Sequence, residues 1–380
     1  MKIDKRNWNT YRFDEFAENI SQRIEPQNTD LSIYVGLEHL DPDSLHIKRH
    51  GSPSDVEGTK LKFYKGDVIF GKRRAYQRKA ALAEYDGICS AHAMVLRAKT
   101  DIIDERLFPF FFHSTIFQTR AIDISVGGLS PTINWKDLAK QEFSLPPKEE
   151  QARLAELLWA ADEVVEREKK LLMNIETYQY AFFKKNYQDN NQPLIALSSL
   201  AEINPRQNKL TNKKTLVSFV TMSDVSNDGE FQNQEILPLK DLEGNGFTTF
   251  TENDILFAKI TPCMENGKGA IAKKLSNGIG FGSTEFHVLR AKEKSDTNFC
   301  FFLTRTKSFR QLAEKLMTGS AGQKRVQPDF FDYYKFHAPS SEKRKYIGET
   351  MQLIEKEKQS IKEQLIHSQQ LKSSLTNQIF

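Results

Sequence analysis

The chain carries the same sequence pattern twice, about 193 residues apart. The segments 87–90 (GICS) and 95–99 (VLRAK) return as 280–283 (GFGS) and 288–292 (VLRAK). Upstream, 67–72 (DVIFGK) matches 254–259 (DILFAK) at an offset of 187, so the second copy has six extra residues between the two blocks. A repeat of this size predicts two similar modules that each need a core of their own.

Each copy ends in a stretch rich in Lys, Glu, Gln and Leu, at 148–187 and 341–380. Residues spaced by three and four along both stretches are mostly apolar, which is typical of a coiled-coil seam. The expected seam positions are 154, 157, 161, 164, 168, 171, 175, 178 and 182 in the first stretch, and 347, 351, 354, 358, 361, 365, 368, 372, 375 and 379 in the second. Forty helical residues make a helix about 60 Å long. Because such a helix must cover its apolar stripe, we expect the two helices to pair antiparallel, with one module at each end.

The expected fold class is α+β, with two repeated α/β modules that are each followed by a helix of roughly 40 residues. Short strands are expected at 34–37 and 66–70, a loop at 127–131, and either a buried helix or a buried strand at 107–117. The expected domains are module one at 1–145, the first long helix at 146–188, module two at 189–338 and the second long helix at 339–380.

Composition narrows the class of protein only slightly. The net charge of +4 is too small to identify a polyanionic partner. The three cysteines, Cys89, Cys263 and Cys300, are too few and too scattered for a disulfide framework or a zinc cluster. No apolar stretch approaches 18 residues and none follows the N-terminus. We therefore expect a cytoplasmic protein without a membrane span or a signal peptide.

The densest basic segment follows the first repeated strand. Residues 72–79 (KRRAYQRK) hold five cations and no acid. Lys and Arg neutralise phosphates, and Arg and Gln can read base edges in the major groove. A solvated surface strand or turn is an equally good interpretation of the segment alone. The matching segment of the second copy, 259–268 (KITPCMENGK), is also polar and basic but differs in composition, as expected of two related readers of different sequences.

One further pair of segments occupies matched places in the two copies. Ser90-Ala91-His92 and Ser283-Thr284-Glu285 precede the VLRAK strands, where they can contact DNA or can simply be polar turns in which Glu285 pairs with a nearby Lys. The expected DNA-binding residues are Lys72, Arg73, Arg74, Tyr76, Gln77, Arg78, Lys79, Ser90, His92 and Ser130 in the first copy, and Lys259, Thr261, Asn266, Lys268, Ser283, Thr284, Glu285, Lys324 and Arg325 in the second.

Catalytic motifs are not found. The eight histidines are scattered, no Gly-rich loop ends in Gly-Lys-Ser/Thr, and no Asn/Asp-Pro-Pro-Tyr segment occurs. Pro328-Asp329 resembles a nuclease motif only faintly, and no Glu-x-Lys partner lies at a convincing distance. We therefore expect neither an active site nor a metal site in this chain.

These residues resemble the specificity (S) subunit of a type I restriction–modification system over essentially the whole chain. The most specific segments are 66–76 (GDVIFGKRRAY), 86–90 (DGICS) and 145–151 (LPPKEEQ), with 254–259, 261–268 and 282–286 in the second copy. The second helix departs from the pattern, because Lys343-Arg344 stands where the family often has an acidic residue followed by Gln.

The resemblance implies a subunit without activity of its own. Each recognition domain would read one half of a bipartite site in double-stranded DNA, while the helices fix the spacer and dock two modification subunits that methylate adenine. Two restriction subunits would complete the complex. The resemblance implies no cofactor in this chain, and S-adenosylmethionine, ATP and Mg in the partner subunits. The alternatives are a stand-alone nuclease or methyltransferase and a protein-only coiled-coil adaptor.

Overall fold

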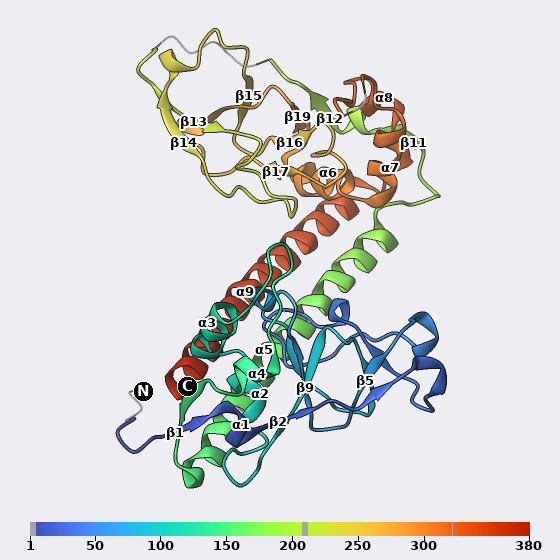
Figure 1. Ribbon diagram of the computed structural model, residues 1–380. Coiled ribbons are helices and arrows are strands. Elements are labelled where there is room, and N and C mark those ends of the chain that lie inside the picture. Colours follow the sequence, from blue (N-terminus) through green and yellow to red (C-terminus); the bar gives the residue numbers. More distant parts are fainter. Residues whose placement is uncertain (1–4, 207–211, 321) are drawn as a thin grey trace. The chain divides into compact units, whose positions relative to one another are not determined.

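The computed structural model describes residues 5–206, 212–320 and 322–380, and it forms two compact units (Figure 1). Unit 1 contains residues 1–170 and 362–380, and unit 2 contains residues 171–361. Two long helices, α5 (Lys148–Asn186) and α9 (Ser341–Ile379), each contribute one part to unit 1 and one part to unit 2. Within the described ranges, no helix combines the length and the apolar character that crossing a bilayer requires.

Unit 1 is built on two small sheets. The first has the strand order β2 (Ala17–Ile20), β9 (Ala93–Ala98), β6 (Val68–Gly71), β7 (Ala80–Leu82), and all its pairs are antiparallel. The second has the order β3 (Arg23–Ile24), β5 (Lys60–Phe63), β8 (Gly87–Cys89), β4 (Tyr34–Val35), and its β4–β8 pair is parallel. β1 (Asn9–Arg12) pairs with β10 (Glu142–Leu145), and the short helices are α1 (Phe13–Phe16), α2 (Phe108–Phe111), α3 (Thr115–Asp123) and α4 (Trp135–Leu138).

Unit 2 repeats this arrangement. Its sheets have the orders β12 (Ala201–Ile203), β19 (Phe286–Ala291), β16 (Ile255–Ala258), β17 (Gly269–Ile271) and β14 (Glu235–Pro238), β13 (Leu216–Val220), β18 (Ile279–Gly282), β15 (Thr248–Thr251). The β13–β18 pair is parallel, like β4–β8. β11 (Leu194–Ala196) pairs with β20 (Lys335–His337), and the short helices are α6 (Thr297–Thr304), α7 (Lys307–Lys315) and α8 (Phe330–Tyr333).

The fold explains several repeated residues. Asp67 and Asp254 are buried, and each accepts two hydrogen bonds from one guanidinium, Arg97 at 2.7 and 3.0 Å and Arg290 at 2.8 and 2.7 Å. These hydrogen bonds raise the pKa of both arginines. A buried carboxylate needs such a partner, so the repeated Asp and Arg are structural residues of each sheet.

The stretch at 107–117 is helical, with α2 near its centre and α3 beginning at Thr115. The Ser114 hydroxyl caps α3 by accepting a hydrogen bond from the Phe117 N–H at 3.3 Å, and Thr306 caps α7 in the same way with Phe309. All five phenylalanines of this stretch are fully buried, and edge-to-face contacts among four of them help to fill the core of unit 1.

The first turns of the two long helices are held by different chemistry at one repeated position. The buried Gln151 amide donates to the carbonyls of Ile102 and Pro146, both at 2.9 Å. In the second copy Arg344 donates to the Pro339 carbonyl at 2.8 Å and to both oxygens of buried Asp296 at 3.0 and 2.8 Å. In the second copy, Arg344 therefore replaces the neutral amide of Gln151 with an ion pair to Asp296. The hydrogen bond to the proline carbonyl is kept.

The expected seam of the second helix is confirmed. Ile347, Met351, Ile354, Lys358, Ile361 and Ile379 are buried, and the intervening seam positions are half-buried. The expected seam of the first helix is right at 154, 161, 168, 175 and 182, which are buried or half-buried, and wrong at 157, 164, 171 and 178, which are exposed. The buried positions of α5 in unit 1 are Gln151, Leu154, Ala155, Leu158, Asp162 and Val165, whereas Leu157 and Val164 are 36% and 46% exposed. The neighbouring positions 158, 165, 172 and 179 are buried or half-buried instead. Because Leu157-Leu158, Val164-Val165 and Leu171-Leu172 are apolar doublets, a count of apolar residues could not choose between the two stripes.

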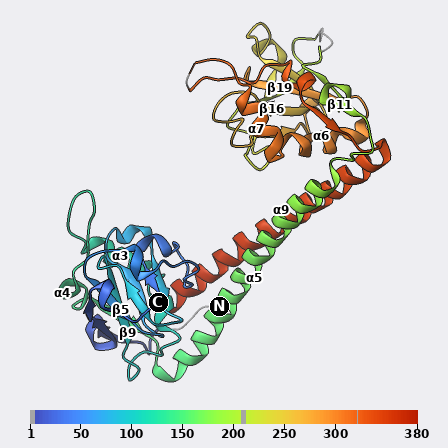
Figure 2. The same cartoon turned by 90° about the vertical axis from the view of Figure 1, so that its right-hand side faces the viewer.

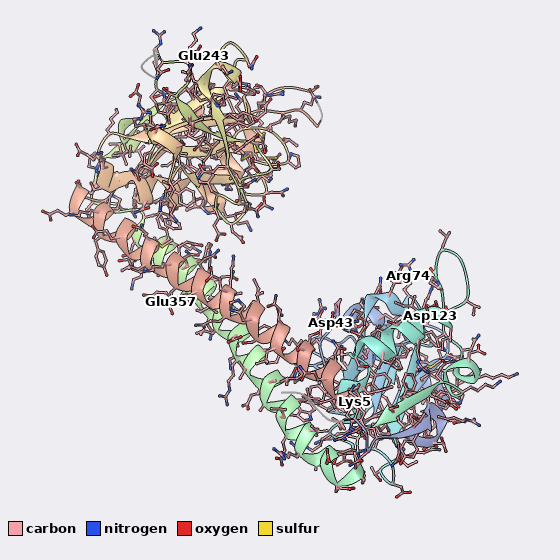
Figure 3. The ribbon with its side chains drawn as sticks, turned by 90° about the vertical axis from the view of Figure 1, so that its left-hand side faces the viewer. Lys5, Asp43, Arg74, Asp123, Glu243 and Glu357 are labelled. Carbon is pink, nitrogen blue, oxygen red and sulfur yellow. The ribbon has the colours of Figure 1, made fainter. Side chains whose placement is uncertain are left out.

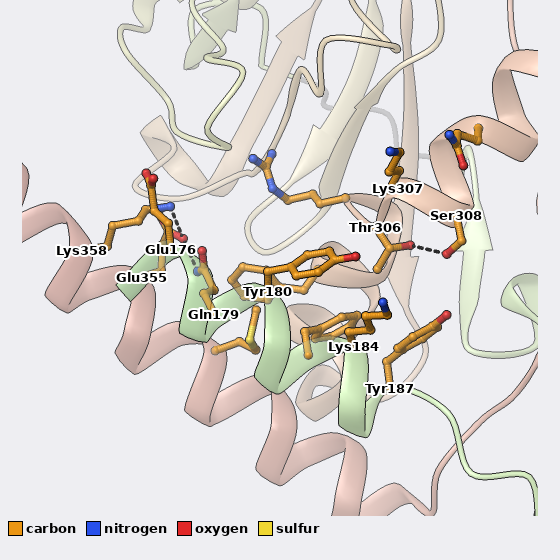
Figure 4. Close-up of a pocket in the computed structure, with 15 residues that line it drawn as sticks. Glu176, Gln179, Tyr180, Lys184, Tyr187, Thr306, Lys307, Ser308, Glu355 and Lys358 are labelled. Carbon is orange, nitrogen blue, oxygen red and sulfur yellow. Dashed lines mark hydrogen bonds and ion pairs between the residues drawn. The ribbon is translucent and has the colours of Figure 1, made fainter. Parts of the chain in front are cut away.

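A polar layer joins the two helices antiparallel within each unit. In unit 1 the Lys372 ammonium donates to Asp162 at 2.9 Å, and the Ser368 hydroxyl donates to Glu168 at 3.1 Å. In unit 2 the Gln179 amide donates to Glu355 at 2.7 Å, and Lys358 also contacts Glu355 at 2.7 Å (Figure 4). This second layer forms one wall of a cavity of about 360 Å³ whose floor includes Phe183 and Met351.

Asp162 also connects the helix pair to the globular part of unit 1. Its carboxylate is 2% exposed and lies 2.6 Å from the His46 ring. Burial alone would raise the pKa of Asp162, but the contacts with His46 and Lys372 outweigh burial and lower it to about 2. The same contact raises the pKa of His46.

These shifts predict how stability depends on pH. Replacing Asp162 with Asn should lower the free energy of unfolding by about 2 to 4 kcal/mol at neutral pH, because Lys372 and His46 lose their charged partner. The difference between the two proteins should shrink as the pH falls from about 4 to about 2, where Asp162 itself protonates. It should also shrink as the pH rises past the raised pKa of His46.

Chemical unfolding of the wild type and Asp162→Asn across this pH range measures the effect. Glu163→Gln is the matched control, because Glu163 is exposed and its ion pair with Arg167, one helical turn away, is a surface pair. An equal loss of stability in the two variants would show that the buried position of Asp162 has no special effect.

Candidate nucleic-acid interface

Three segments that are distant in the sequence meet at one surface of unit 1. We call this surface junction 1 and define it as Lys72–Arg74, Ser90–His92 and Ser130–Ile133. Backbone hydrogen bonds hold it together: Arg73 N–H donates to the His92 carbonyl at 3.3 Å, Arg74 N–H to the Pro131 carbonyl at 2.8 Å, and Ile133 N–H to the Lys72 carbonyl at 3.0 Å.

Unit 2 has a corresponding junction 2, which we define as Lys259–Thr261, Ser283–Glu285 and Lys324–Val326. Lys259 N–H donates to the Glu285 carbonyl at 2.9 Å, Thr261 N–H to the Lys324 carbonyl at 3.0 Å, and Val326 N–H to the Lys259 carbonyl at 2.9 Å. DNA-binding residues were predicted from the sequence in all three segments of each copy. That the three segments lie next to one another was not predicted. The backbone pattern is shared while the side chains differ.

Junction 1 is strongly cationic. It contains Lys72, Arg73 and Arg74 and no carboxylate. The Arg73 guanidinium lies 3.3 Å from the His92 ring, and burial, Arg73 and Lys72 together lower the pKa of His92. Arg74 has a left-handed backbone with φ of 56°, which turns the chain outward, and its Nε donates to the Ser130 hydroxyl at 3.2 Å. Figure 3 shows Arg74 at the surface of unit 1.

Junction 2 combines cations with one carboxylate. The Arg325 guanidinium donates to both Glu285 oxygens, at 2.9 and 3.0 Å, which lowers the pKa of Glu285 and raises that of Arg325. Behind them lies buried His287, a residue that the sequence did not single out. Burial lowers its pKa to about 4, so the neutral ring can donate to the Val326 carbonyl at 2.8 Å while it accepts from the Asn204 amide at 3.1 Å.

Several expected DNA-binding residues lie outside the junctions. The Arg78 guanidinium donates to Asp43 at 2.6 Å and to the His113 carbonyl at 2.9 Å, and the Lys79 ammonium donates to the Leu37 carbonyl at 2.6 Å. Lys268 is bound to the Met222 carbonyl at 2.9 Å. These three cations therefore hold loops of their own units in place.

The remaining expected residues have fewer contacts. Tyr76 is exposed on the short turn between Arg74 and Arg78, and Gln77 is half-buried there. Thr261 donates to Glu265 at 2.6 Å, and Asn266 is exposed on the turn that follows. The hydroxyls of Ser90 and Ser283 cap their own turns by accepting the N–H of His92 and Glu285 at 3.2 Å, and Thr284 between them in the second copy is exposed.

A loop of unit 1 projects beyond junction 1, between α3 and α4 (Figure 2). Val126 and Thr132 close its base by two backbone hydrogen bonds, at 3.0 and 2.9 Å. Leu129 at its tip is 97% exposed. The sequence identified the loop and Ser130 but not Leu129, although an apolar residue between two glycines and Ser-Pro was the available signal.

The thiol of Cys89 lies inside the core near junction 1, and burial raises its pKa to about 12. In the part of the chain that the structure describes, no three His, Cys, Asp or Glu side chains gather into a potential metal site.

Comparisons with known proteins agree with this arrangement. The family described as "Type I restriction modification DNA specificity domain" matches residues 6–177 and again residues 193–368. The chain is 40% identical over 165 residues to the type I restriction enzyme EcoEI specificity subunit of Escherichia coli, a match that covers 42% of this chain and 27% of that protein. It is 30% identical over 169 residues to the EcoDI specificity subunit of the same organism, covering 43% of this chain and 37% of that protein. The chain thus spans well under half the length of these relatives.

Solved structures show the same fold over almost the whole chain. The S subunit of a type I restriction–modification system from M. genitalium superposes with a TM-score of 0.64 at 14% identity, covering 100% of this chain and 98% of that one. A chain from a structure of a type I R-M system, solved to explain its complex assembly and conformational transition, gives 0.57 at 15% identity, covering 98% and 97%. With two family matches, two repeated modules and two long helices, the chain belongs to the family of type I restriction–modification DNA specificity domains.

Proposed function

We propose that this chain gives a type I restriction–modification complex its DNA sequence specificity. Each unit binds one half of a bipartite site in double-stranded DNA, and the base pairs between the halves are spanned without being read. The proposal rests on the two junctions. Backbone hydrogen bonds of a similar pattern close both junctions, and the two junctions present different side chains. Phosphate contacts from the cations supply affinity, and the differing side chains supply sequence.

The helices have two further roles in this proposal. They set the spacer between the half-sites, and they dock two modification subunits. Those subunits supply S-adenosylmethionine and methylate adenine, while two restriction subunits supply the chemistry that requires ATP and Mg. This chain catalyses no reaction itself, and it acts in the cytoplasm.

The proposal is tested by expressing the chain with its modification subunits and mapping methylated adenines in the host DNA. A single bipartite motif is the expected result. Methylation or cleavage by the purified chain alone would indicate a stand-alone enzyme. Failure of the complex to select any site in a pool of random duplexes would leave a protein-only adaptor.

The junctions predict which cations contact phosphate. Replacing both Arg73 and Arg74 with Ala should lower the slope of log affinity against log salt by about 2, because each lost phosphate contact removes about 0.9 from it. Arg78→Ala should leave the slope unchanged and reduce stability, since Arg78 binds Asp43 and His113. DNA-binding titrations of both variants between 50 and 200 mM salt measure the slopes. A lower slope for Arg78→Ala and an unchanged slope for the double variant would place the phosphate contacts at Arg78.

Helix length predicts the spacer. We would insert one heptad between Lys170 and Leu171 of α5 and another between Glu363 and Gln364 of α9, so that the antiparallel pairing is preserved. Seven residues add about 10 Å, which corresponds to about three base pairs of DNA at 3.4 Å each. The methylated motif should keep both half-sites and gain that spacer. An unchanged spacer in a folded, active complex would show that the helices do not measure the site.

The exposed stripe of α5 predicts where a modification subunit docks in unit 1. Leu157 and Val164 are seven residues apart, so they share a face that α9 leaves uncovered. Replacing both with Ser should abolish co-elution with the modification subunit and leave the unfolding midpoint unchanged. Ile366 and Leu371 of α9 are also exposed, but five residues separate them and they lie on different faces. The double Ser variant at these positions is the control, and a loss of co-elution there alone would assign docking to α9.

A further inference from the structure

The loop 126–132 presents an apolar tip above a cationic base. Leu129 is 97% exposed, and Gly127, two residues before it, has φ of 116°, a conformation that residues with a side chain rarely adopt. Single exposed apolar residues are common on protein surfaces, so the exposure of Leu129 becomes informative only through its surroundings.

Those surroundings belong to junction 1. Arg74 holds the loop twice, through its N–H to the Pro131 carbonyl at 2.8 Å and through its Nε to the Ser130 hydroxyl at 3.2 Å. Arg73 pairs with Thr132 at the base of the loop. The Arg74 guanidinium is therefore bound to the loop that carries the leucine, and Arg73 is joined to the base of the same loop through its backbone. A duplex bound by these two arginines would lie within reach of the tip.

We propose that Leu129 enters the DNA bound by unit 1 as a wedge that unstacks one base step. This inference rests on the proposed function. Three residues from the base to the tip reach up to about 10 Å, and a DNA groove is about 8 Å deep. Apolar side chains that enter a base stack lose contact with water and kink the duplex, while nearby cations hold the backbone on either side.

The sequence of the second unit has no leucine at the matching place. The corresponding loop between Thr318 and Arg325 reads GSAGQK in the sequence, and the position that matches Leu129 at the offset of 193 is Gly322. The wedge should therefore distort one half-site and leave the other undistorted. Sequence specificity in the half-site that unit 1 binds then depends partly on how easily the base step entered by Leu129 deforms.

The test uses the full chain bound to its modification subunits and a duplex that carries the mapped site. 2-Aminopurine, whose fluorescence rises on unstacking, is placed at successive positions of both half-sites. The methylated adenine is left out, because a methyltransferase can unstack its target base by itself. The Arg73→Ala, Arg74→Ala variant identifies the half-site that unit 1 binds.

Wild-type complex should raise the fluorescence at one step of that half-site and at none in the other. Leu129→Ala should remove this signal and weaken binding about 15- to 60-fold, as expected from losing two or three buried methylene-sized groups. Leu129→Met should retain both the signal and the affinity. Ile122→Ala is the matched control, because Ile122 is 45% exposed on α3 outside the loop and should have no effect.

Three results would contradict the proposal that Leu129 acts as a wedge. The first is unchanged fluorescence and affinity in Leu129→Ala. The second is weakened binding by Leu129→Ala without any unstacking in the wild type, which would make Leu129 a groove-edge contact. The third is an equal signal in both half-sites. If the wild-type complex shows no preference for its mapped site, the proposed function fails instead.

Discussion

The backbone hydrogen bonds that close each junction are the constraint on which the rest of the molecule depends. They join the segment after β6 or β16 to a distant loop and to the turn before β9 or β19. Because N–H and carbonyl groups make these bonds, side chains there can change without loss of the surface. Cations dominate junction 1, whereas an ion pair dominates junction 2. One scaffold can therefore present two different recognition surfaces.

Much of the fold was predictable because it depends on local pattern. The repeat predicted two modules, and the spacing of apolar residues predicted the second seam. The first seam was right at every second position and wrong at the others, because Leu157-Leu158 and Val164-Val165 offer two equally apolar stripes and only the second residue of each doublet is buried. Periodicity measures hydrophobicity and cannot tell which residue of an apolar doublet lies in the interface.

The candidate site was predictable in its residues but not in its geometry. Composition cannot separate Arg74, which faces outward beside Ser130, from Arg78, which is bound to Asp43 and a main-chain carbonyl. That distinction depends on tertiary contacts 35 and 56 residues away in the sequence. Leu129 was missed because an apolar residue does not resemble a DNA ligand when polar chemistry is the search criterion.

The different contacts at the first turns of the two long helices limit which modules can be exchanged. Gln151 anchors the first helix as a neutral amide that satisfies carbonyls, and Arg344 anchors the second through buried Asp296. A recognition module transplanted from one site to the other would leave a guanidinium without its carboxylate, or a buried carboxylate without its cation. Recombination between such modules therefore keeps the first turn of the helix bound only when the residue on the helix and its partner in the module are exchanged together.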